Sequence, residues 1–373
     1  MLEKYGFVKK FKEKEKAPTV VVGMSGGVDS SVAAFVCKWL GYNTIGLFMK
    51  NWEEKNNDQC CAVDDFEDVK RVAEVIGIPY YSVNFVREYK ERVFDEFLRG
   101  LEQGITPNPD VLCNREIKFD AFLKHALALG AEFVATGHYA RVVAVGGEYH
   151  LLKGLDNNKD QSYFLCNVTQ EQFSRIMFSI GHLCKDVVRQ IAAEAGLITA
   201  DKPDSTGICF VGERKFAEFL GGFLKDKEGE IKTVDGRVVG RHRGLVYYTL
   251  GQRKGLGIGG MSGEVDNRWY VVEKNMETNT LVVSNGEGEE LFSSELVARN
   301  FNAIGTVGTK FDCMAKVRYR QDDQGCSVEV LGDGLRVVFE KPQRAVTPGQ
   351  WVVLYDGERC LGGAQIQSTS PIK

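Results

Sequence analysis

The stretch VVVGMSGGVDSS, residues 20–31, joins an apolar run, a glycine-rich turn and the start of a helix without a break. An apolar run such as residues 20–24 is typical of a buried strand in a parallel sheet. Gly26 and Gly27 let the backbone approach a ligand without a Cβ clash, and the N–H groups that open the following helix then face an anion. Asp29 adds a carboxylate that could hold a Mg²⁺ ion bridging phosphates. No Gly-Lys-Ser/Thr follows, so this is not a Walker loop, and the alternative is an ordinary glycine-rich turn with a serine cap.

Strands continue to alternate with helices on the C-terminal side of this loop. Gly41 and Gly77 follow two of the expected helices at the position where a left-handed cap is usual. The pattern predicts strands over residues 20–24, 44–49, 80–83 and 132–136, and helices over 30–40, 63–76, 87–101, 116–129, 171–177, 185–195 and 214–223. This alternation indicates an α/β fold with a doubly wound, Rossmann-like parallel sheet.

The last third of the chain changes to short strands separated by Gly and Asp-Gly turns. Strands are expected over residues 234–239, 244–249, 269–273, 280–283, 316–320, 326–330 and 335–339. We therefore expect a lysine-rich tail over 1–16, an α/β domain over 17–215, a small mixed α+β domain over 216–285 and a C-terminal β-barrel over 286–373. The tail is interpreted as a solvated terminus, and no role is assigned to it.

The composition narrows the class of protein. Of the 373 residues, 43% are hydrophobic and 26% are charged, as in ordinary globular proteins, and no apolar run is long enough to span a membrane. Ten cysteines without a secretory signal favour a reducing compartment, the cytoplasm. A net charge of −4 argues against non-specific coating of nucleic acid, but it allows a local basic surface.

Three further motifs carry residue types that are common in active sites. In NPDVLCN, residues 108–114, Cys113 is expected near a helix start, where a thiolate is favoured, although a buried structural cysteine is the alternative. In DSTGICFVGER, residues 204–214, Cys209 lies near Arg214, and a cation lowers the pKa of a thiol. GHYAR, residues 137–141, follows the fourth expected strand, at the sheet edge where ligands bind in this fold class.

The loop at residues 25–31 resembles the pyrophosphate loop of ATP pyrophosphatases, which have the adenine nucleotide alpha hydrolase fold and split ATP into AMP and pyrophosphate. Together with NPDVLCN and DSTGICFVGER, it makes residues 18–367 similar to the tRNA-specific 2-thiouridylases. The resemblance implies ATP and Mg²⁺ as cofactors, with ATP bound by Gly23, Met24, Ser25, Gly26, Gly27, Val28, Asp29, Ser30, Met49 and Gly137. It implies that Asn108, Pro109 and Asp110 hold the target base, and that tRNA is contacted by His138, Lys159, Asp160, Gln161, Arg318, Tyr319 and Gln350.

The same resemblance implies roles for two cysteines. Cys209 would carry a persulfide delivered by a sulfur donor protein, such as a sulfur relay protein or a cysteine desulfurase, and Cys113 would be its partner thiol. The wobble uridine of the tRNA anticodon arm would be adenylated at its C2 oxygen and then receive the sulfur. The reaction would end in a transient Cys113–Cys209 disulfide. The sequence has no C-x-x-C pair, so neither an iron–sulfur cluster nor a zinc site is expected.

Basic surface for RNA is expected in the later domains. Residues 225–254 carry eight Lys or Arg against four Asp or Glu, and residues 298–320 carry five against one. Two rival functions remain at this point. An ammonia-dependent amidating ligase, similar to GMP or NAD synthetase, would use the same loop without either cysteine. An RNA-binding protein with a decayed nucleotide site would bind tRNA without turning over ATP.

Overall fold

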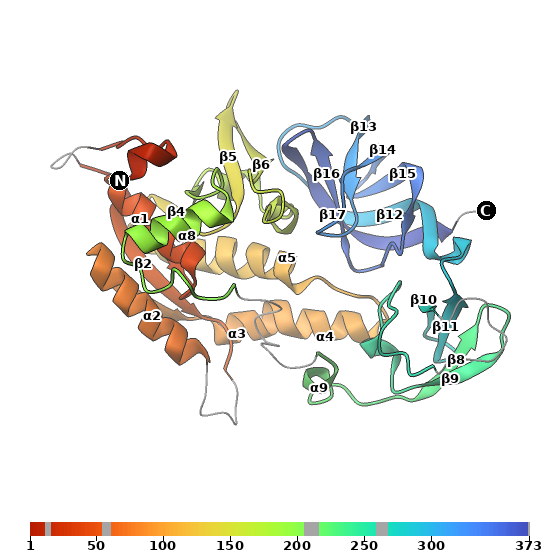
Figure 1. The fold of residues 1–373 in the computed structure, drawn as a ribbon. Helices are drawn as coiled ribbons and strands as arrows, with labels where there is room; N and C mark the ends of the chain where they lie inside the picture. Colours follow the sequence, from red (N-terminus) through yellow and green to blue (C-terminus); the bar gives the residue numbers. More distant parts are fainter. Residues whose placement is uncertain (12–15, 54–60, 205–215, 259–267, 372–373) are drawn as a thin grey trace.

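The computed structural model describes residues 1–11, 16–53, 61–204, 216–258 and 268–371. The first large unit is a parallel sheet in the order β3-β2-β1-β4-β7 (Figure 1). Its strands are β1 (Thr19–Met24), β2 (Asn43–Lys50), β3 (Tyr80–Asn84), β4 (Phe133–Thr136) and β7 (Ile176–Phe178). The order grows outward from β1 in both directions, so the doubly wound fold predicted from the sequence is confirmed, and the switch point lies between β1 and β4.

Helices cover both faces of this sheet because alternate residues of β1 point to opposite sides. Val20 and Val22 pack with α1 (Val28–Trp39), α2 (Cys61–Ile76) and α8 (Lys185–Glu194), and Val21 packs with the helices between β3 and β4. Those helices are α3 (Val86–Tyr89), η2 (Lys90–Phe94), α4 (Asp95–Glu102), α5 (Pro109–Cys113), η3 (Asn114–Ala121) and α6 (Phe122–Ala128). Further short helices are η1 (Leu2–Tyr5), η4 (Ser162–Leu165), α7 (Gln170–Phe173) and α9 (Phe216–Leu220).

Two β units follow, as the short strands in the sequence indicated. The central unit is a sheet in the order β10-β11-β8-β9, with β8 (Gly229–Thr233), β9 (Val238–His242), β10 (Trp269–Asn275) and β11 (Thr280–Asn285). The C-terminal strands are β12 (Phe292–Ala303), β13 (Lys310–Lys316), β14 (Gln324–Leu331), β15 (Gly334–Arg344), β16 (Trp351–Asp356) and β17 (Arg359–Pro371). Because β12 pairs with both β15 and β17, these strands close into the expected barrel.

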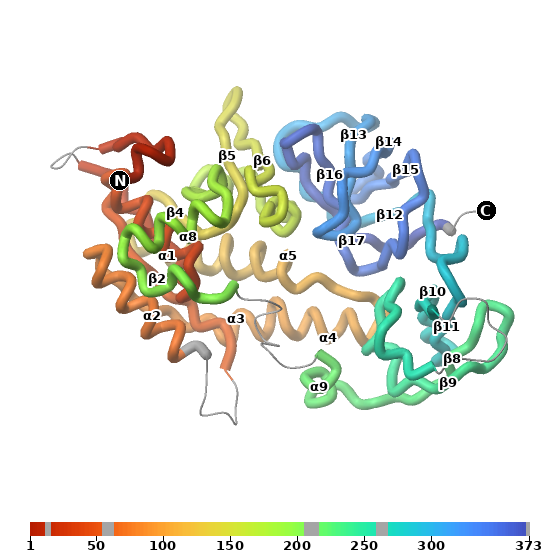
Figure 2. Tube along the Cα trace, in the orientation of Figure 1, coloured from red at the N-terminus to blue at the C-terminus, as the bar shows by residue number. Residues whose placement is uncertain are grey.

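A hairpin from the α/β unit is attached to this barrel, which the sequence did not indicate. The strands β5 (Ala140–Val145) and β6 (Glu148–Lys153) pair with each other, and β6 also pairs with β17. Figure 2 shows the hairpin standing beside the barrel. Arg359 and Cys360 of β17 pair with Leu152 and Leu151 of β6, so the barrel is joined to the chain that leaves β4.

The N-terminal segment is not the solvated tail that the lysines suggested. Leu2 is fully buried and Phe7 is almost fully buried, both in the core that covers one face of the parallel sheet. The backbone N–H of Lys10 donates to the Leu40 carbonyl, and Lys4 forms an ion pair with Glu194. The prediction of a solvated tail was wrong because it rested on the lysines and did not take into account the apolar residues Leu2 and Phe7, which are buried.

Several predicted elements have different bounds or a different type. The helix expected to begin near residue 116 begins at Pro109, and residues 244–249 contain the short helix η5 (Leu245–Tyr247) instead of a strand. The strand expected over 316–320 ends at Lys316, and the helix expected over 171–177 gives way to β7 at Ile176. No helix in the described ranges is long and apolar enough to cross a membrane.

Candidate active site

The glycine-rich loop lies at the carboxyl end of β1 and leads directly into α1. The Ser30 hydroxyl accepts from the Ser25 N–H at 3.1 Å, and the Ser31 hydroxyl donates to the Gly27 carbonyl at 2.9 Å. Gly26 has φ +75°, and a Cβ there would lie 2.7 Å from the Asp65 carbonyl oxygen. The loop therefore has a fixed shape that requires glycine, and the first N–H groups of α1 open onto it.

Three strands bring the other expected nucleotide residues to this loop. Gly137 directly follows β4, and a Cβ on it would lie 2.7 Å from the Ser30 nitrogen and the Asp29 carbonyl carbon. A Cβ on Gly23 would lie 3.6 Å from the end of the Met49 side chain, near the carboxyl end of β2. Since the carboxyl ends of parallel strands share one sheet edge, these residues form one site at the switch point.

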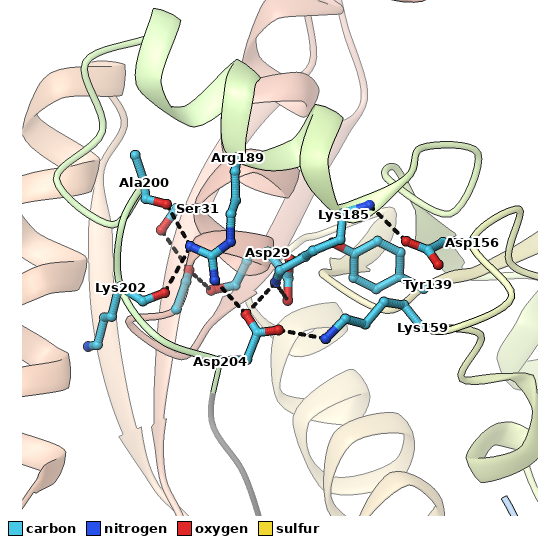
Figure 3. A network of polar contacts seen from close by, with 12 residues as sticks. Asp29, Ser31, Tyr139, Asp156, Lys159, Lys185, Arg189, Ala200, Lys202 and Asp204 are labelled. Atoms are coloured by element: carbon cyan, nitrogen blue, oxygen red, sulfur yellow. Dashed lines mark hydrogen bonds and ion pairs between the residues drawn. The ribbon is translucent and has the colours of Figure 1, made fainter. Parts of the chain in front are cut away.

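The carboxylate of Asp29 is surrounded by donors (Figure 3). Lys185 Nζ contacts both of its oxygens at 2.7 and 2.8 Å, and the Tyr139 hydroxyl donates to it at 2.7 Å. Burial, followed by the charge of Asp29, raises the pKa of Tyr139 far above its usual value. Tyr139 is therefore a neutral donor, and Lys185 supplies the positive charge beside the loop.

A second carboxylate, Asp204, extends this network from the start of the DSTGICFVGER segment. Its oxygens form ion pairs with Lys159 at 2.6 Å and with Lys185 and Arg189 at 2.8 Å (Figure 3). Burial opposes ionisation of Asp204, but the hydrogen bonds from Lys159 and Lys185 outweigh it and lower the pKa of its carboxyl to about 2. Lys185 thus bridges the nucleotide loop and the residue that precedes the Cys209 segment.

The residues around Asp29 were compared with what a Mg²⁺ site requires. Both carboxylate oxygens already contact Lys185, and an ammonium group beside a carboxylate disfavours a second cation there. Among the residues that the structure describes, no group of three His, Cys, Asp or Glu is placed to hold a metal ion. The described residues do not fit a Mg²⁺ site built by the protein alone, and Asp29 as a metal ligand stays a prediction.

The NPDVLCN segment begins a helix earlier than expected. The Asn108 side chain caps α5 by accepting from the backbone N–H groups of Asp110 and Val111, and Pro109 stands at the first helical position. Cys113 lies at the end of α5 and is only 4% exposed. Burial raises the pKa of Asp110, and the nearby Lys118 ammonium partly offsets this shift. A half-buried carboxyl of raised pKa and a buried thiol therefore lie on one short helix.

His138 connects this helix to the nucleotide site. Lys118 Nζ lies 3.5 Å from Nε2 of His138, and the Thr136 hydroxyl lies 2.7 Å from Nδ1. Because an ammonium group only donates, Nε2 accepts and Nδ1 carries the proton. Burial lowers the pKa of His138 well below its usual value, and the Lys118 charge lowers it further. His138 is thus a neutral residue between Gly137, which packs on the loop, and Lys118 on η3, the helical segment that directly follows α5 and Cys113.

Cys209 lies outside the described residues, as does the rest of 205–215. Its distance from Cys113 is not defined here, so the persulfide role of Cys209 and the Cys113–Cys209 disulfide stay predictions. Asp204, at the start of the segment, is described and lies in the Lys185 network.

Three residues expected to contact tRNA use their side chains inside the protein. Asp160 is 7% exposed, and its carboxylate accepts from the N–H groups of Gly154 and Ser162. The Gln161 side chain accepts from the Tyr139 N–H at 2.9 Å, and Lys159 pairs with Asp204. These contacts fix the turn that follows β6, and tRNA contact by these residues stays a prediction.

The three expected tRNA contacts in the barrel also make contacts within the protein. Arg318 donates to the Leu250 carbonyl of the central unit at 2.9 Å and to the Ala345 carbonyl of the barrel at 3.0 Å. The Tyr319 ring packs on Phe164 with the ring centres 4.4 Å apart. Gln350 contacts the loop before α5. All three residues therefore lie where units of the protein meet.

Sequence reasoning missed three cations of the site: Lys118, Lys185 and Arg189. The pattern at residues 185–195 indicated a helix, and α8 indeed begins at Lys185. Nothing local marked Lys185 or Arg189 as facing the nucleotide loop, because their partners lie elsewhere in the chain. Asp204, which opens the DSTGICFVGER motif, pairs with Lys185 and Arg189, but its side chain is 30% exposed and the sequence does not indicate which cations it binds.

Comparisons with known proteins find matches along nearly the whole chain. Three family models match: a tRNA methyl transferase HUP domain over residues 18–213, a tRNA methyl transferase PRC-barrel domain over 217–285 and an aminomethyltransferase beta-barrel domain over 293–366. Among solved structures, the U34-tRNA thiolase NcsA from Methanococcus maripaludis matches 51% of this chain and 60% of its own, at 18% identity and a TM-score of 0.34.

Curated relatives match the chain almost end to end. The tRNA-specific 2-thiouridylase MnmA of Exiguobacterium sibiricum is 57% identical over 361 residues, covering 95% of this chain and 96% of that protein. The protein of the same name from Alkaliphilus oremlandii is 56% identical over 360 residues, covering 94% of this chain and 98% of that protein. Identity at this level over all three units means that the chain belongs to the family of tRNA-specific 2-thiouridylases.

Proposed function

We infer that the protein catalyses the ATP-dependent 2-thiolation of uridine in tRNA and is therefore a tRNA sulfurtransferase. The observation that carries this inference is the continuous line of contacts from the nucleotide loop to the helix of Cys113. Gly137 packs on Asp29 and Ser30, His138 follows Gly137, and His138 contacts Lys118. An activated oxygen and an attacking sulfur must meet at one carbon atom, which requires these two regions to adjoin.

The chemistry begins with activation, because a carbonyl oxygen of a pyrimidine is a poor leaving group. The C2 oxygen of the wobble uridine attacks the α-phosphate of ATP, and pyrophosphate leaves. The base must be turned out of its stack for this step, and Asn108, Pro109 and Asp110 are proposed to hold it. The nucleotide loop, with Lys185 beside it, stabilises the charge that develops on the leaving pyrophosphate.

Sulfur then replaces the activated oxygen. The terminal sulfur of a Cys209 persulfide attacks C2 and displaces AMP. The Cys113 thiolate attacks the Cys209 sulfur and breaks the persulfide bond, which leaves the terminal sulfur on the base and forms a Cys113–Cys209 disulfide. A dithiol reductant returns the two electrons and restores both thiols. Alternatively, Cys113 releases the terminal sulfur first, and the freed sulfide attacks C2; the same disulfide results.

The reaction defines the partners and cofactors that we propose. ATP is the nucleotide, and Mg²⁺ enters with it as the counter-ion of its phosphates. The anticodon arm of tRNA is the substrate, and a protein that carries a persulfide supplies the sulfur. Because the substrate is tRNA, we place the reaction in the cytoplasm.

Two other reactions are weaker candidates. The matched family models are described as tRNA methyl transferase domains, but the curated relatives that match the full chain are named for thiolation. An ammonia-dependent amidating ligase would use the same nucleotide loop, yet it would leave Cys113, buried on the helix beside Lys118, without a role.

The test is an in vitro thiolation assay. Purified protein is incubated with unmodified tRNA, ATP, Mg²⁺ and a persulfide donor, and 2-thiouridine is measured by mass spectrometry after digestion. We expect product in the wild type and none in Cys209→Ser. Cys184→Ser is the matched control: Cys184 directly precedes Lys185, but it is exposed and its side chain makes no capping hydrogen bond to α8. Undiminished product in Cys209→Ser would refute the persulfide role, and AMP formation that depends on ammonia would support the ligase.

A further inference from the structure

A turn of the barrel binds the loop that precedes α5. The Thr106 N–H donates to the Pro348 carbonyl at 2.9 Å. The amide nitrogen of Gln350 donates to the carbonyl oxygens of Thr106 at 2.7 Å and Pro107 at 3.4 Å. The Asn108 amide lies 3.5 Å from the Gln350 side-chain oxygen. The barrel turn, residues 347–350, therefore binds the target-base loop, residues 106–110, through both backbone and side chain.

Gly349 shows how closely the two backbones approach. Its φ is +92°, and a Cβ on it would lie 2.9 Å from the nitrogen and the carbonyl carbon of Thr106 and 3.0 Å from the Cβ of Ile105. The turn itself is anchored in the barrel, because the Gly349 N–H donates to the Ile366 carbonyl of β17 at 2.8 Å. Only glycine fits this position, for reasons of conformation and of space.

The other side of the same segment is also packed tightly. A Cβ on Gly100 of α4 would lie 2.3 Å from the Pro107 ring. A Cβ on Gly104, which has φ +84°, would lie 2.6 Å from the Met276 side chain of the central unit. Figure 1 shows the chain that leaves α4 passing between the barrel and the β8–β11 sheet. All three units of the protein therefore fix the approach to the target-base loop.

We propose that the barrel turn is a positioning element of sulfur transfer and that Gln350 and Gly349 are its positioning residues. Gln350 holds Asn108, Asn108 caps α5, and α5 ends at Cys113. A displacement of the loop therefore moves the base-binding residues and the thiol together. The inference rests on the proposed function, in which residues 108–110 hold the base, and it assigns to the barrel a part in the chemical step in addition to RNA binding.

The test compares two variants with a matched control. Gly349→Ala forces the loop away, and Gln350→Ala removes its side-chain anchor. Gly357→Ala is the control, because Gly357 also has a positive φ in the barrel, but a Cβ there meets nothing within 4 Å. The single-turnover rate of 2-thiouridine formation is measured at saturating tRNA and ATP, beside the Kd for tRNA, the Kd for ATP and the melting temperature.

We expect both variants to lower the single-turnover rate on the order of tenfold or more, since a shift of about 1 Å at a reacting group has effects of that size. The Kd for ATP stays that of the wild type in both variants, the Kd for tRNA of Gly349→Ala changes by less than about twofold, and the control keeps its rate. A higher Kd for tRNA in Gln350→Ala is compatible with the proposal as long as the rate at saturating tRNA also falls. A loss in Gln350→Ala that is confined to the Kd for tRNA would overturn the proposal, because Gln350 would then be a direct RNA contact only.

A wild-type rate in folded Gly349→Ala would also overturn the proposal. If Gly349→Ala does not fold, the rates of Gln350→Ala and Gln350→Glu test the proposal instead. Neither substitution adds atoms to the contact. Gln350→Glu keeps the shape of the side chain but removes the amide group that donates to the Thr106 carbonyl. A wild-type protein that makes no 2-thiouridine would refute the proposed function itself. The wild-type assay thus tests the proposed function, and the variant assays test the positioning role of the barrel turn.

Discussion

The nucleotide loop, residues 23–30, is shaped by contacts between residues such as Ser25 and Ser30, which are five positions apart. The target-base loop, residues 106–110, is held by Gln350, which lies 244 positions away from Thr106. The hydrogen bonds that shape the first loop lie within one strand–turn–helix unit, on which Asp65 and Gly137 pack, whereas the second loop is hydrogen-bonded to a turn of the barrel. The nucleotide step should therefore tolerate damage to the barrel, and sulfur transfer should not.

The largest effect is expected at Gly137, where the nucleotide loop meets its neighbouring strand. In Gly137→Ala, the new Cβ would collide with the backbone of Asp29 and Ser30, which cannot move aside as a side chain could. We expect ATP affinity to fall by about tenfold or more, as binding geometry is lost. Equilibrium binding of a non-hydrolysable ATP analogue measures it. Gly308→Ala, in the barrel with its nearest neighbour at 3.4 Å, should bind like the wild type.

A smaller loss is expected when the charge beside the loop is removed. Lys185→Met leaves Asp29 and Asp204 without their shared cation, so ATP affinity should fall roughly fivefold and Lys185→Arg should recover part of it. The same binding assay applies, with Lys70→Met as control because Lys70 contacts the exposed Glu67 and the Phe66 ring of its own helix. Equal affinity in Lys185→Met and the wild type would show that Lys185 only holds the fold together.

Lys118→Met is expected to alter the pH dependence of thiolation with little effect on ATP binding. The Lys118 ammonium lowers the pKa of Asp110 against the effect of burial, so its removal should raise that pKa further. The limb of the pH–rate profile that reflects Asp110 should then move to higher pH, because the carboxyl keeps its proton longer. A profile measured in single turnovers that coincides with that of the wild type would exclude Asp110 as the titrating group.

The smallest effects on ATP binding and on the chemical step are expected from two nearby arginines on the barrel, which should act on stability and on tRNA binding. Arg318 donates hydrogen bonds to two carbonyl groups within the protein, whereas Arg320 is exposed. Arg318→Met should cost about 1–3 kcal/mol in unfolding free energy, the usual effect of leaving buried hydrogen-bond partners unmet. Arg320→Met should leave stability unchanged and reduce the salt slope of tRNA binding by about 1, if Arg320 contacts a phosphate. The reverse result would identify Arg318 as the RNA contact.

The strand, the glycine-rich loop and the helix of the candidate nucleotide site could be predicted from the sequence because their signals are local. The apolar run before Gly26, the glycines and the helix start all lie within residues 20–31. Gly137 could be placed at the same edge because it directly follows a strand of the parallel sheet. The parallel sheet and the barrel also followed from alternation and turn residues, whereas in the central unit only the strands expected over 269–273 and 280–283 match observed strands, β10 and β11.

The other features of the fold and of the candidate site depend on contacts between distant residues, which leave no local pattern in the sequence. Lys185 was visible only as the start of a helix, and Gln350 was expected to contact RNA although its amide binds Thr106. The pairing of β6 with β17 joins residues that are far apart in the chain, and no turn residue or hydrophobic periodicity in the sequence indicates this pairing. The N-terminal segment was misjudged because its charge was counted and its two buried apolar residues were not.

The account is tested most directly by following two products of one reaction, pyrophosphate and 2-thiouridine, in wild type and in Cys113→Ser. With tRNA, ATP and a persulfide donor, we predict that the wild type forms both products and that Cys113→Ser still releases pyrophosphate but forms no 2-thiouridine. Thiolation in Cys113→Ser at the wild-type rate, or a wild type that releases pyrophosphate and never forms 2-thiouridine, would contradict it.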